Sequence, residues 1–578
     1  MLLQNKYVHI SACMLALLLC VLAARPFVSM GVCDDWSYIW TARALADTGH
    51  LTYNGWATAM LGWQIYLGAL FIKLFGFSFT AVRFSVLAVS LLCAALMQRI
   101  FVRLGTSESM ASVATLSLVL SPLFLPLSFN FMTDIPSLFV LVLCIYCCFR
   151  AFQSASDKAA LGWLAFAALS NIVGGTVRQI AWLGALVMVP SAAWSMRHRR
   201  HMLPAGAVSW GISVLSVAFL MRWFHAQPYV AIEKIFYKYH TYSALFAVNI
   251  ALTLLTCLLP VMSAFLITNL VGKHSVRNIA AITAAVVGSI FFWWASTTRI
   301  NYFNSFRDTP FSPAGNYVTL KGVGVGSILG DLPDVVPVSV RLMLTIATFA
   351  ALASFVVIFM NSRNELHAAD VDGTPRRHPY ACMSNTSLVM LFVPFTLAYG
   401  FLVMTRSPIY DRYLLPLQFI FTLGLIRVYR QTISEKLPRL CLLVGLVYAV
   451  YSVAAMHDLF AFDRARVNAA NKITATGIPR TAIEGGFDYD AWTQLKQTGY
   501  VNEPRMVVPS GAYQPWIRPD NVPLLCLGWF RSYTPSIQPI LHLSHQPDNC
   551  FGPSQFAPVA YETWLPPRHR EIYILESH

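Results

Sequence analysis

Charged residues are scarce in this chain. Only 12% of its 578 residues are Asp, Glu, Lys or Arg, while 57% are hydrophobic. A soluble globular protein has about 25% charged and about 45–50% apolar residues. This shortage of charge excludes a chain whose whole surface faces water. The composition instead predicts a protein that lies largely within a lipid bilayer.

Acidic residues are the scarcer kind of charge, with 26 Asp and Glu against 41 Lys and Arg. The resulting formal charge of +15 could indicate a nucleic-acid partner. Here, however, the basic residues form short clusters between apolar runs, where cytoplasmic connections of membrane proteins carry them. We therefore expect no nucleic-acid partner.

Several sequence signals are also missing. No small-residue cleavage pattern closes the apolar stretch 8–28, so we interpret it as a retained first helix and not as a secretory signal. The spacing of His and Cys supports no zinc site. Most of the twelve cysteines lie inside apolar runs. Only Cys526 and Cys550 share a long polar region, which allows one disulfide there if that region lies outside the cytoplasm.

Long apolar runs are abundant. A helix needs about 20 apolar residues to cross a bilayer core of about 30 Å. Counting such runs predicts an all-α polytopic membrane protein with about thirteen transmembrane helices. The predicted spans are 8–28, 79–101, 109–128, 135–152, 159–175, 178–196, 203–223, 244–271, 278–297, 338–360, 386–405, 409–427 and 438–456.

The basic clusters give these helices a consistent orientation. Starting from Lys6 in the cytoplasm, every second connection carries a basic cluster, as the positive-inside rule requires. The opposite side then receives the loops 29–78, 224–243 and 298–337, three short turns and the tail. We expect a bacterial inner-membrane protein with its active site and its tail outside the cytoplasm.

Two domains follow from this map. Residues 1–456 form the membrane domain, with a long first outer loop, 29–78. Within that loop, Asp34–Ala46 has apolar residues at helical spacing and a Gly49 stop, which predicts an amphipathic helix along the membrane interface. The tail, 457–578, is predicted to form a small extracytoplasmic domain of α+β or irregular structure.

Four carboxylates lie at the ends of predicted spans on the outer side: Asp34, Asp35, Asp134 and Asp411. Carboxylates beside membrane helices are costly and suggest function. For Asp34 and Asp134 there is also a structural interpretation, because an Asp at a helix start can cap free N–H groups. Only their common location on one face favours a site.

Three motifs in this order resemble the GT-C glycosyltransferases of the dolichyl-phosphate-mannose protein mannosyltransferase type and their bacterial relatives. They are Asp34-Asp35-x-x-Tyr38, Thr133-Asp134-x-Pro136 and Arg412-Tyr413-Leu414-x-Pro416. The resemblance implies a GT-C fold and a hexosyl- or pentosyltransferase that uses a polyprenyl-phosphate sugar. The first loop lacks the Lys-Pro-Pro element usual in the lipid A aminoarabinose transferases, which argues against that donor.

By this resemblance Asp34 is the general base, with the second catalytic carboxylate at Asp35. An inverting transfer from a polyprenyl-phosphate donor to an acceptor hydroxyl needs such a base and cations that hold the phosphate. The acceptor is a protein, lipid or glycan. The predicted substrate-binding residues are Tyr38, Gln64, Asp134, Arg178, Arg307, Arg412 and Tyr413, with Arg178 as the first choice for the phosphate.

Structural alternatives accompany several of these residues. Arg178 could pair with Asp134 only to hold helices together, and Arg412 could pair with its neighbour Asp411. A divalent cation bound by Asp34, Asp35 and Asp134 is left open, and no other cofactor is implied.

Two further segments are candidates for the site. The loop 298–337, with its Gly322-x-Gly324-x-Gly326 run, is interpreted as a flexible lid. The cluster 485–492 of the tail is rich in aromatic and acidic residues. It could contact an acceptor sugar or simply pack in a turn.

Two other functions compete with the transferase. A secondary transporter or flippase would show paired, interrupted helices with ionisable groups near the bilayer midplane. A lipid-linked oligosaccharide ligase would share the donor and transfer a whole chain. The crowding of carboxylates on one face favours the glycosyltransferase.

Overall fold

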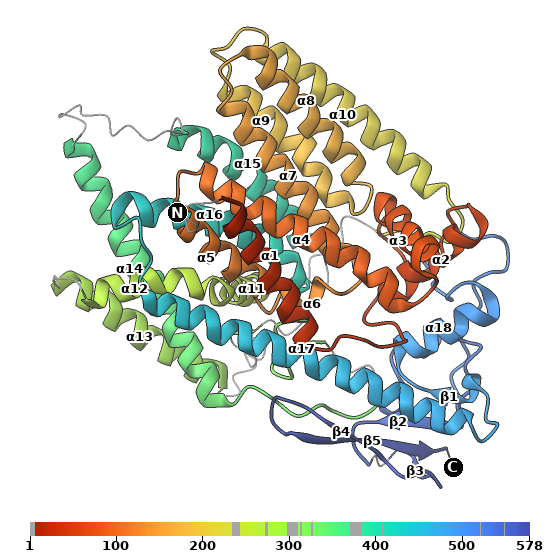
Figure 1. The fold of residues 1–578 in the computed structure, drawn as a ribbon. Coiled ribbons are helices and arrows are strands. Elements are labelled where there is room, and N and C mark those ends of the chain that lie inside the picture. The colour runs from red at the N-terminus through yellow and green to blue at the C-terminus, as the bar shows by residue number, and fades with distance from the viewer. Residues whose placement is uncertain are drawn as a thin grey trace.

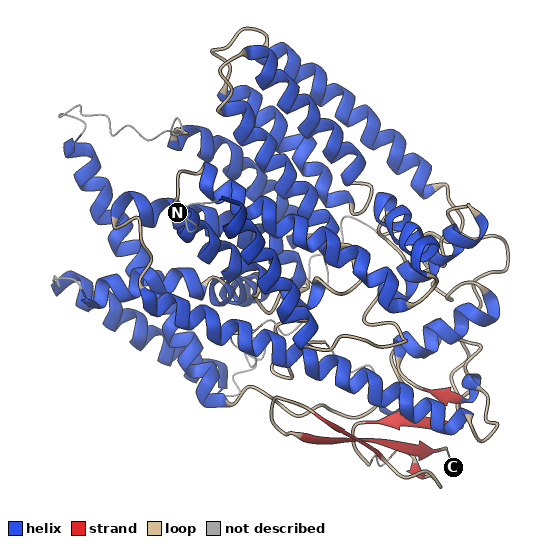
Figure 2. Ribbon diagram, viewed as in Figure 1, coloured by secondary structure: helices blue, strands red, loops and turns tan. Residues whose placement is uncertain are grey.

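The computed structural model describes residues 6–233, 243–271, 276–297, 310–311, 315–324, 328–369, 383–406, 409–520, 522–547 and 550–577. The chain forms a large helical part with a small strand-containing region at one end (Figures 1 and 2). This arrangement confirms the predicted mainly helical fold with a C-terminal region that contains strands. All of the strands named below lie in the C-terminal tail.

The helices of the first half are mostly long and apolar. Their bounds are α1 Lys6–Ala23, α2 Asp35–Thr48, α3 Gly62–Phe75, α4 Phe79–Arg103, α5 Glu108–Val119, α6 Phe124–Leu127, α7 Asp134–Phe152, α8 Asp157–Gly174, α9 Val189–Ser195 and α10 Met202–His225. The second half continues with α11 Ser243–Cys257, α12 Leu259–Val271, α13 Val276–Thr297, α14 Val338–Ala369, α15 Asn385–Met404, α16 Leu415–Thr432, α17 Arg439–Thr474 and α18 Phe487–Thr498.

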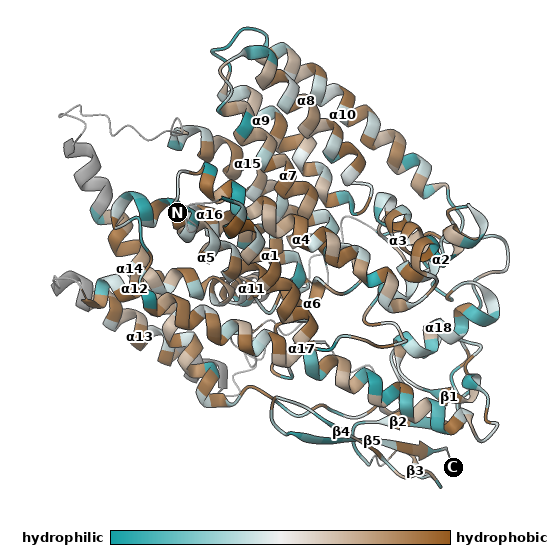
Figure 3. Cartoon of the chain, viewed as in Figure 1, coloured by the Kyte–Doolittle hydropathy of each residue, from teal (hydrophilic) through white to brown (hydrophobic). Residues whose placement is uncertain are grey.

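The chain is an integral membrane protein. Among the described residues, seven helices are long and apolar enough to cross a membrane, or eight if the bent pair α11 and α12 counts as one span. Apolar residues cover these helices, and on α10 they face outward: Leu215 is 72% and Phe219 is 69% exposed (Figure 3). In contrast, most residues of α7 are buried. Helix α7 is therefore an inner helix, and α10 presents its apolar side chains to lipid.

Each predicted span overlaps helix, although the first span, 8–28, continues beyond α1 and several other spans are interrupted. The predicted span 244–271 is two helices, α11 and α12, bent by 74°. The predicted spans 109–128 and 178–196 are likewise divided into shorter pieces. Helices α8 and α16, which lie on two further predicted spans, are not apolar enough along their length to count as membrane spans by composition alone. The number of crossings, about thirteen, stays a prediction.

The first outer loop contains two helices. The predicted helix 34–46 exists as α2, and Gly49 ends it with a φ of 77°, a left-handed conformation that glycine adopts without strain. Helix α2 differs from the prediction in its surroundings, because Trp36, Ile39 and Ala42 are fully buried. It packs against α3 and α18, so protein covers it where a membrane interface was expected.

Helix α17 joins the membrane part to the tail. It runs for 36 residues, about 54 Å at about 1.5 Å per residue, so the predicted domain boundary at residue 456 falls inside one continuous helix (Figure 1). Figure 3 shows its first half brown and its second half largely teal. The helix thus changes from apolar to polar where it leaves the membrane part.

The tail adds α18 and a small mixed sheet. Its strands are β1 Ile483–Glu484, β2 Leu541–Ser544, β3 Gly552–Pro553, β4 Val559–Glu562 and β5 His569–Glu576. The strand order is β1-β2-β5-β3, and β4 pairs with the first half of β5. Strands β1 and β2 are parallel, and the pairs with β5 are antiparallel. A disulfide joins Cys526 to Cys550, which confirms the pairing predicted from their shared polar region.

The tail is docked on the first outer loop. The Val501 amide donates to the Asn54 carbonyl at 2.8 Å, and the Trp40 and Trp492 rings lie 5.3 Å apart. Within the tail, the Asp458 carboxylate of α17 accepts the amides of Trp564 and Leu565 at 2.6 and 2.9 Å, which attaches the segment before β5 to this helix. These contacts make the tail one wall of a space that it shares with the membrane part.

Candidate active site

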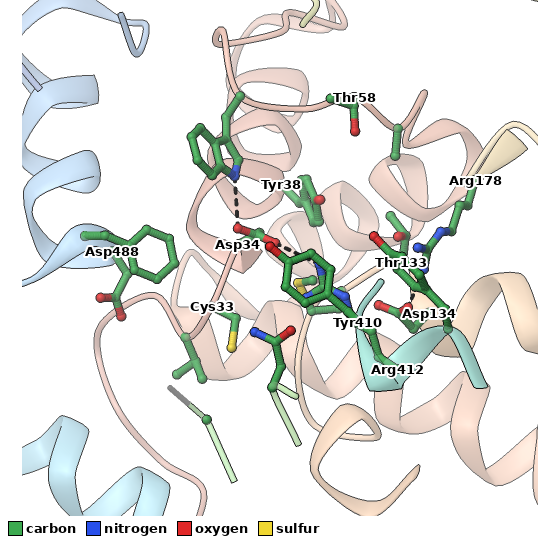
Figure 4. Close-up of a pocket in the computed structure, with 18 of the residues that line it drawn as sticks. Cys33, Asp34, Tyr38, Thr58, Thr133, Asp134, Arg178, Tyr410, Arg412 and Asp488 are labelled. Atoms are coloured by element: carbon green, nitrogen blue, oxygen red, sulfur yellow. Dashed lines mark hydrogen bonds and ion pairs between the residues drawn. The ribbon is translucent and has the colours of Figure 1, made fainter. Parts of the chain in front are cut away.

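A cavity of about 580 Å³ lies between the first outer loop, the turn before α7, the turn before α16 and the tail. Figure 4 shows carboxylates and guanidinium groups from these separate segments facing one another. Of the predicted site residues, Asp34, Tyr38, Asp134, Arg178, Arg412 and Tyr413 line it. Arg307 lies outside the described residues.

Asp34 precedes α2, yet its side chain does not cap that helix. The carboxylate turns into the cavity, where Oδ1 accepts the Trp56 indole N–H at 3.0 Å and Oδ2 lies 3.4 Å from Arg412 Nη2. Its side chain is 20% exposed. The capping interpretation of Asp34 is therefore wrong, and the carboxylate remains accessible from the cavity.

Asp35 faces the opposite way. Its carboxylate pairs with Arg83 at 2.7 Å and accepts the Val32 amide at 2.7 Å, and both charged side chains are fully buried. Arg83 also donates to the Met30 carbonyl at 2.7 Å. Asp35 does not line the cavity. Its contacts hold the start of the first loop on α4, so the structure gives this predicted catalytic residue a structural position.

Asp134 begins α7 and pairs with Arg178 through Oδ1. Its second oxygen, Oδ2, is buried and has no hydrogen-bond partner among the described residues. A buried acceptor without a donor is costly, so a hydroxyl or other donor from a ligand would stabilise it. The predicted Asp134–Arg178 pair exists, and it borders the cavity.

The turn that carries Arg178 is fixed to the first loop. The Leu61 amide donates to the Val177 carbonyl at 3.2 Å, and the Gln179 side chain donates to the Thr58 carbonyl at 3.0 Å. Gly62 permits this approach, because a Cβ there would lie 2.7 Å from the Thr176 carbonyl carbon. The two segments therefore position Arg178 and Asp34 in one cavity.

Arg412 does not pair with its neighbour Asp411 through its side chain, contrary to the structural alternative. Asp411 is fully buried and accepts the amides of Asn316, Tyr317 and Val318 at 3.1, 2.8 and 2.6 Å. The Arg412 guanidinium is left to reach Asp34, and its Nε has no partner among the described residues. Asp411 thus anchors part of the loop 298–337 and leaves Arg412 available to the cavity.

Tyr413 brings the two arginines together. Its ring lies 4.5 Å from the Arg178 guanidinium and 5.8 Å from that of Arg412. Tyr410 adds a second ring, 4.8 Å from Arg412. Stacking on aromatic rings offsets part of the repulsion between neighbouring cations. The result is two guanidinium groups around one ring, with Arg412 facing Asp34 and Arg178 facing Asp134.

Tyr38 and Gln64 differ in their access to the cavity. Tyr38 lines it, and burial together with the nearby Asp34 raises the pKa of the Tyr38 phenol well above its usual range. The phenol therefore stays protonated and can donate. Gln64 is buried and donates to the carbonyls of Phe131 and Met132 at 3.1 and 3.2 Å. It supports the turn before Asp134 and has no place among the lining residues.

The described part of the loop 298–337 is anchored at two points. Asp411 holds its Asn316–Val318 amides, and Leu329 pairs with Ser544 next to the tail sheet. Gly315, Asn316 and Gly324 line the cavity. These described residues form part of the cavity wall, and the flexible-lid interpretation of the loop stays a prediction.

Sequence reasoning missed several lining residues. Trp56, Tyr410 and an Arg406–Glu233 ion pair border the cavity, as does Arg466 of α17. Arg466 is 1% exposed and bridges Asp463 at 2.8 Å and Asp488 at 2.7 Å. Of the aromatic and acidic cluster 485–492, Phe487 and Asp488 line the cavity. The cluster was the available signal, but its sequence does not reveal that the tail folds back on the first loop.

The three aspartates considered for a cation do not form a common site. Within the described residues, no three His, Cys, Asp or Glu side chains are grouped to hold a metal ion. Asp34, Asp35 and Asp134 each face a different arginine instead. The cationic groups of this site are guanidinium groups.

Comparison with known proteins finds one family that matches part of the chain. Residues 60–223 match the family of dolichyl-phosphate-mannose-protein mannosyltransferases. This segment contains the Asp134 motif and Arg178, while the motifs at Asp34 and Arg412 lie outside it. The match confirms the predicted resemblance to this family over a segment that is less than half of the chain.

Similar solved structures are distant in sequence and in superposition. ArnT from Cupriavidus metallidurans in the apo state is 14% identical with a TM-score of 0.34, covering 83% of each chain. The same protein bound to undecaprenyl phosphate gives a TM-score of 0.35 at 14% identity, covering 82% of each chain. The oligosaccharyltransferase AglB from Archaeoglobus fulgidus, in complex with an inhibitory peptide and a dolichol-phosphate, is 13% identical with a TM-score of 0.41. It matches 92% of this chain to 64% of its own. No protein with a curated description matches the chain.

Proposed function

We propose that this protein transfers a sugar, with inversion, from a polyprenyl-phosphate donor to an acceptor hydroxyl in the cavity, with Asp34 as general base. The observation that carries the proposal is the position of Asp34. Its carboxylate does not cap a helix, is accessible from the cavity and faces Arg412, and Arg178 lines the same cavity. The match of residues 60–223 to the dolichyl-phosphate-mannose-protein mannosyltransferases supports the donor class.

The geometry of Asp34 suits a base. An ionised carboxylate has about four acceptor positions, and the Trp56 indole and Arg412 take two of them. The remaining positions can accept the proton of a bound hydroxyl. The two contacts fix the direction of the carboxylate, which a base needs in order to act at a single hydroxyl.

Arg178 and Arg412 are proposed to hold the phosphate. A guanidinium can bind two phosphate oxygens through parallel hydrogen bonds. Both groups now face aspartates, Asp134 and Asp34. The donor phosphate offers each guanidinium a second anion, and negative charge grows on this phosphate as the sugar leaves. If Arg412 moves to the phosphate, the Asp34 carboxylate becomes available to the acceptor.

The reaction then balances with one base. Asp34 removes the acceptor hydroxyl proton while the oxygen attacks the anomeric carbon from the face opposite the phosphate. The bond between the anomeric carbon and the phosphate oxygen breaks, and polyprenyl phosphate leaves with the electron pair. Because this phosphate is a weak base, no general acid is required. The new glycosidic bond has inverted stereochemistry.

We also propose that the cavity opens on the extracytoplasmic side. Its lining comes from the first loop, the turns at Asp134, Arg178 and Arg412, and the tail. The positive-inside rule assigns all of these connections to the side opposite the basic clusters. A bacterial inner membrane is the proposed location.

The test is sugar transfer by the purified, detergent-solubilised protein from a panel of radiolabelled polyprenyl-phosphate monosaccharides to a cell-envelope extract. The native protein should release polyprenyl phosphate, and the Asp34→Asn variant should not, although it elutes and melts as the native protein does. Full activity in Asp34→Asn would reject Asp34 as the base. No turnover with any donor would favour a transporter or a ligase for a longer lipid-linked glycan.

A further inference from the structure

Three aromatic rings form a row along one wall of the cavity. Trp56, Phe487 and Trp529 all line it, and the ring centroids are 6.5 Å apart for the first pair and 5.5 Å apart for the second. Adjacent rings in the row are tilted by 40° and 38°. The row begins at the proposed base, because the Trp56 indole donates to Asp34. The row ends at Trp529, which is 63% exposed.

A second layer of rings supports this row from behind. Phe530 lies 5.2, 5.3 and 5.2 Å from Trp56, Phe487 and Trp529. Trp36 is fully buried against the first two of these rings. Neither Phe530 nor Trp36 lines the cavity. The cavity-facing rings are therefore held in place before any ligand binds, which reduces the entropy lost on binding.

The exposure of Trp529 is not required by packing. Single exposed apolar residues are ordinary on protein surfaces, but Trp529 continues a supported row, lines the cavity and is largely exposed. Large aromatic side chains in such positions are typical of binding sites. The rings of Trp56, Phe487 and Trp529 thus form a preformed aromatic surface for a ligand, called the platform below.

A fixed carboxylate lies next to this platform. Asp488 follows Phe487 in α18 and also lines the cavity. Arg466 holds it through a hydrogen bond of 2.7 Å, and the side chains of both residues are nearly fully buried. A carboxylate bound in this way can still accept hydrogen bonds from hydroxyl groups. Ring faces beside a hydroxyl acceptor suit a ligand with apolar faces and a polar rim.

We infer that this wall is the acceptor subsite and that the acceptor is a carbohydrate of more than one sugar unit. Its pyranose faces would stack along Trp56, Phe487 and Trp529, hydroxyls would reach Asp488, and the reacting hydroxyl would lie at Asp34. A peptide that adds as a strand would draw its affinity mainly from main-chain hydrogen bonds, whereas this wall presents ring faces and a carboxylate. The inference rests on the proposed function and adds the class of acceptor.

The test measures binding separately from transfer. Full-length protein in nanodiscs is titrated with defined monosaccharides, with short oligosaccharides and with Ser- and Thr-containing peptides, and polyprenyl phosphate binding is measured in parallel. Oligosaccharides should bind more tightly than monosaccharides. Trp529→Ala should weaken oligosaccharide binding roughly 10-fold and Trp529→Phe much less, because an aromatic face contributes most of the contact. The polyprenyl phosphate affinity of both variants should match that of the native protein.

Trp564 provides the matched control. It is a tail tryptophan of 47% exposure that lies outside the cavity lining and stacks on His457. Trp564→Ala should bind oligosaccharides as the native protein does. The inference is overturned if peptides bind and glycans do not, or if Trp529→Ala and Trp564→Ala behave alike. A third outcome is glycan binding that depends on Trp529, with no sugar transfer from any donor. This outcome would reject the proposed function but support a glycan-binding site at Trp529.

Discussion

Two consecutive aspartates, Asp34 and Asp35, illustrate how differently one acid–arginine pair can be used in two regions of this protein. The Asp35–Arg83 pair is sealed between the first loop and α4, with neither side chain exposed. The Asp34–Arg412 pair lies at the cavity, with side-chain exposures of 20% and 10%. The sealed pair is also closer, at 2.7 Å against 3.4 Å.

The difference lies in what surrounds each pair. Arg83 also donates to the backbone carbonyls of Val28 and Met30, and its side chain is fully buried, so a ligand cannot reach it. Arg412 keeps an Nε without a partner in the described part of the chain. A pair with all groups satisfied stabilises the fold, and a pair with groups left open can exchange its partners for a substrate.

Asp34→Asn is expected to have the largest effect on activity. Loss of the base should lower the rate of sugar transfer by roughly 10²- to 10⁴-fold, because general-base catalysis contributes about that factor. Thermal unfolding in detergent should change little, since Asp34 caps no helix. The transfer rate and the thermal unfolding curve are measured on the same preparation. A large loss of stability would show that Asp34, like Asp35, mainly stabilises the fold.

Asp35→Asn should show the opposite pattern. It leaves the Arg83 charge buried without compensation, which costs roughly 3–5 kcal/mol of folding stability. The fraction that remains folded should transfer sugar at a rate close to that of the native protein. Unfolding by heat or denaturant, with activity normalised to folded protein, measures the two effects. A folded but inactive Asp35→Asn variant would support the sequence-based prediction that Asp35 is catalytic.

Arg412→Lys is expected to have an intermediate effect. The lysine keeps the charge but loses the planar fork that binds two oxygens, so donor affinity should fall on the order of 10- to 100-fold. Arg83→Lys is the matched change in the sealed pair and should lower stability without changing donor affinity in the folded protein. Binding of labelled polyprenyl phosphate separates the two, and equal donor affinities would contradict the comparison.

Trp56→Phe should have the smallest effect of the four. It removes the indole N–H that fixes Asp34 and retains a ring in the row, so transfer should slow by roughly 5-fold, the value of one modest hydrogen bond. The change should appear in kcat and leave the KM for the donor nearly constant. An unchanged kcat would show that Arg412 alone orients the carboxylate.

The helices of this protein were largely predictable from its sequence. Long apolar runs mark them because a bilayer allows few other ways to satisfy backbone groups. The break between α11 and α12 and the burial of α2 were not predictable, since both depend on neighbouring segments. The Cys526–Cys550 disulfide was predicted because the two cysteines share a polar region outside the apolar runs.

The candidate site was predictable only in part. Motif order brought Asp34, Asp134 and Arg412 together correctly as lining residues. It did not separate Asp35 from Asp34, because adjacent residues share every local sequence signal. It also missed Trp56 and Trp529, whose positions depend on the docking of the tail.

The sequence by itself determined that this chain lies in a membrane and that its carboxylates gather at one end of its helices. Both properties follow from composition and periodicity, which act locally along the chain. Only the tertiary structure decided which carboxylate faces a cavity, which arginine each one meets, and that the tail supplies a wall of aromatic rings. These depend on contacts between residues hundreds of positions apart, such as Asp34 with Arg412, and no local pattern encodes the direction in which a side chain turns.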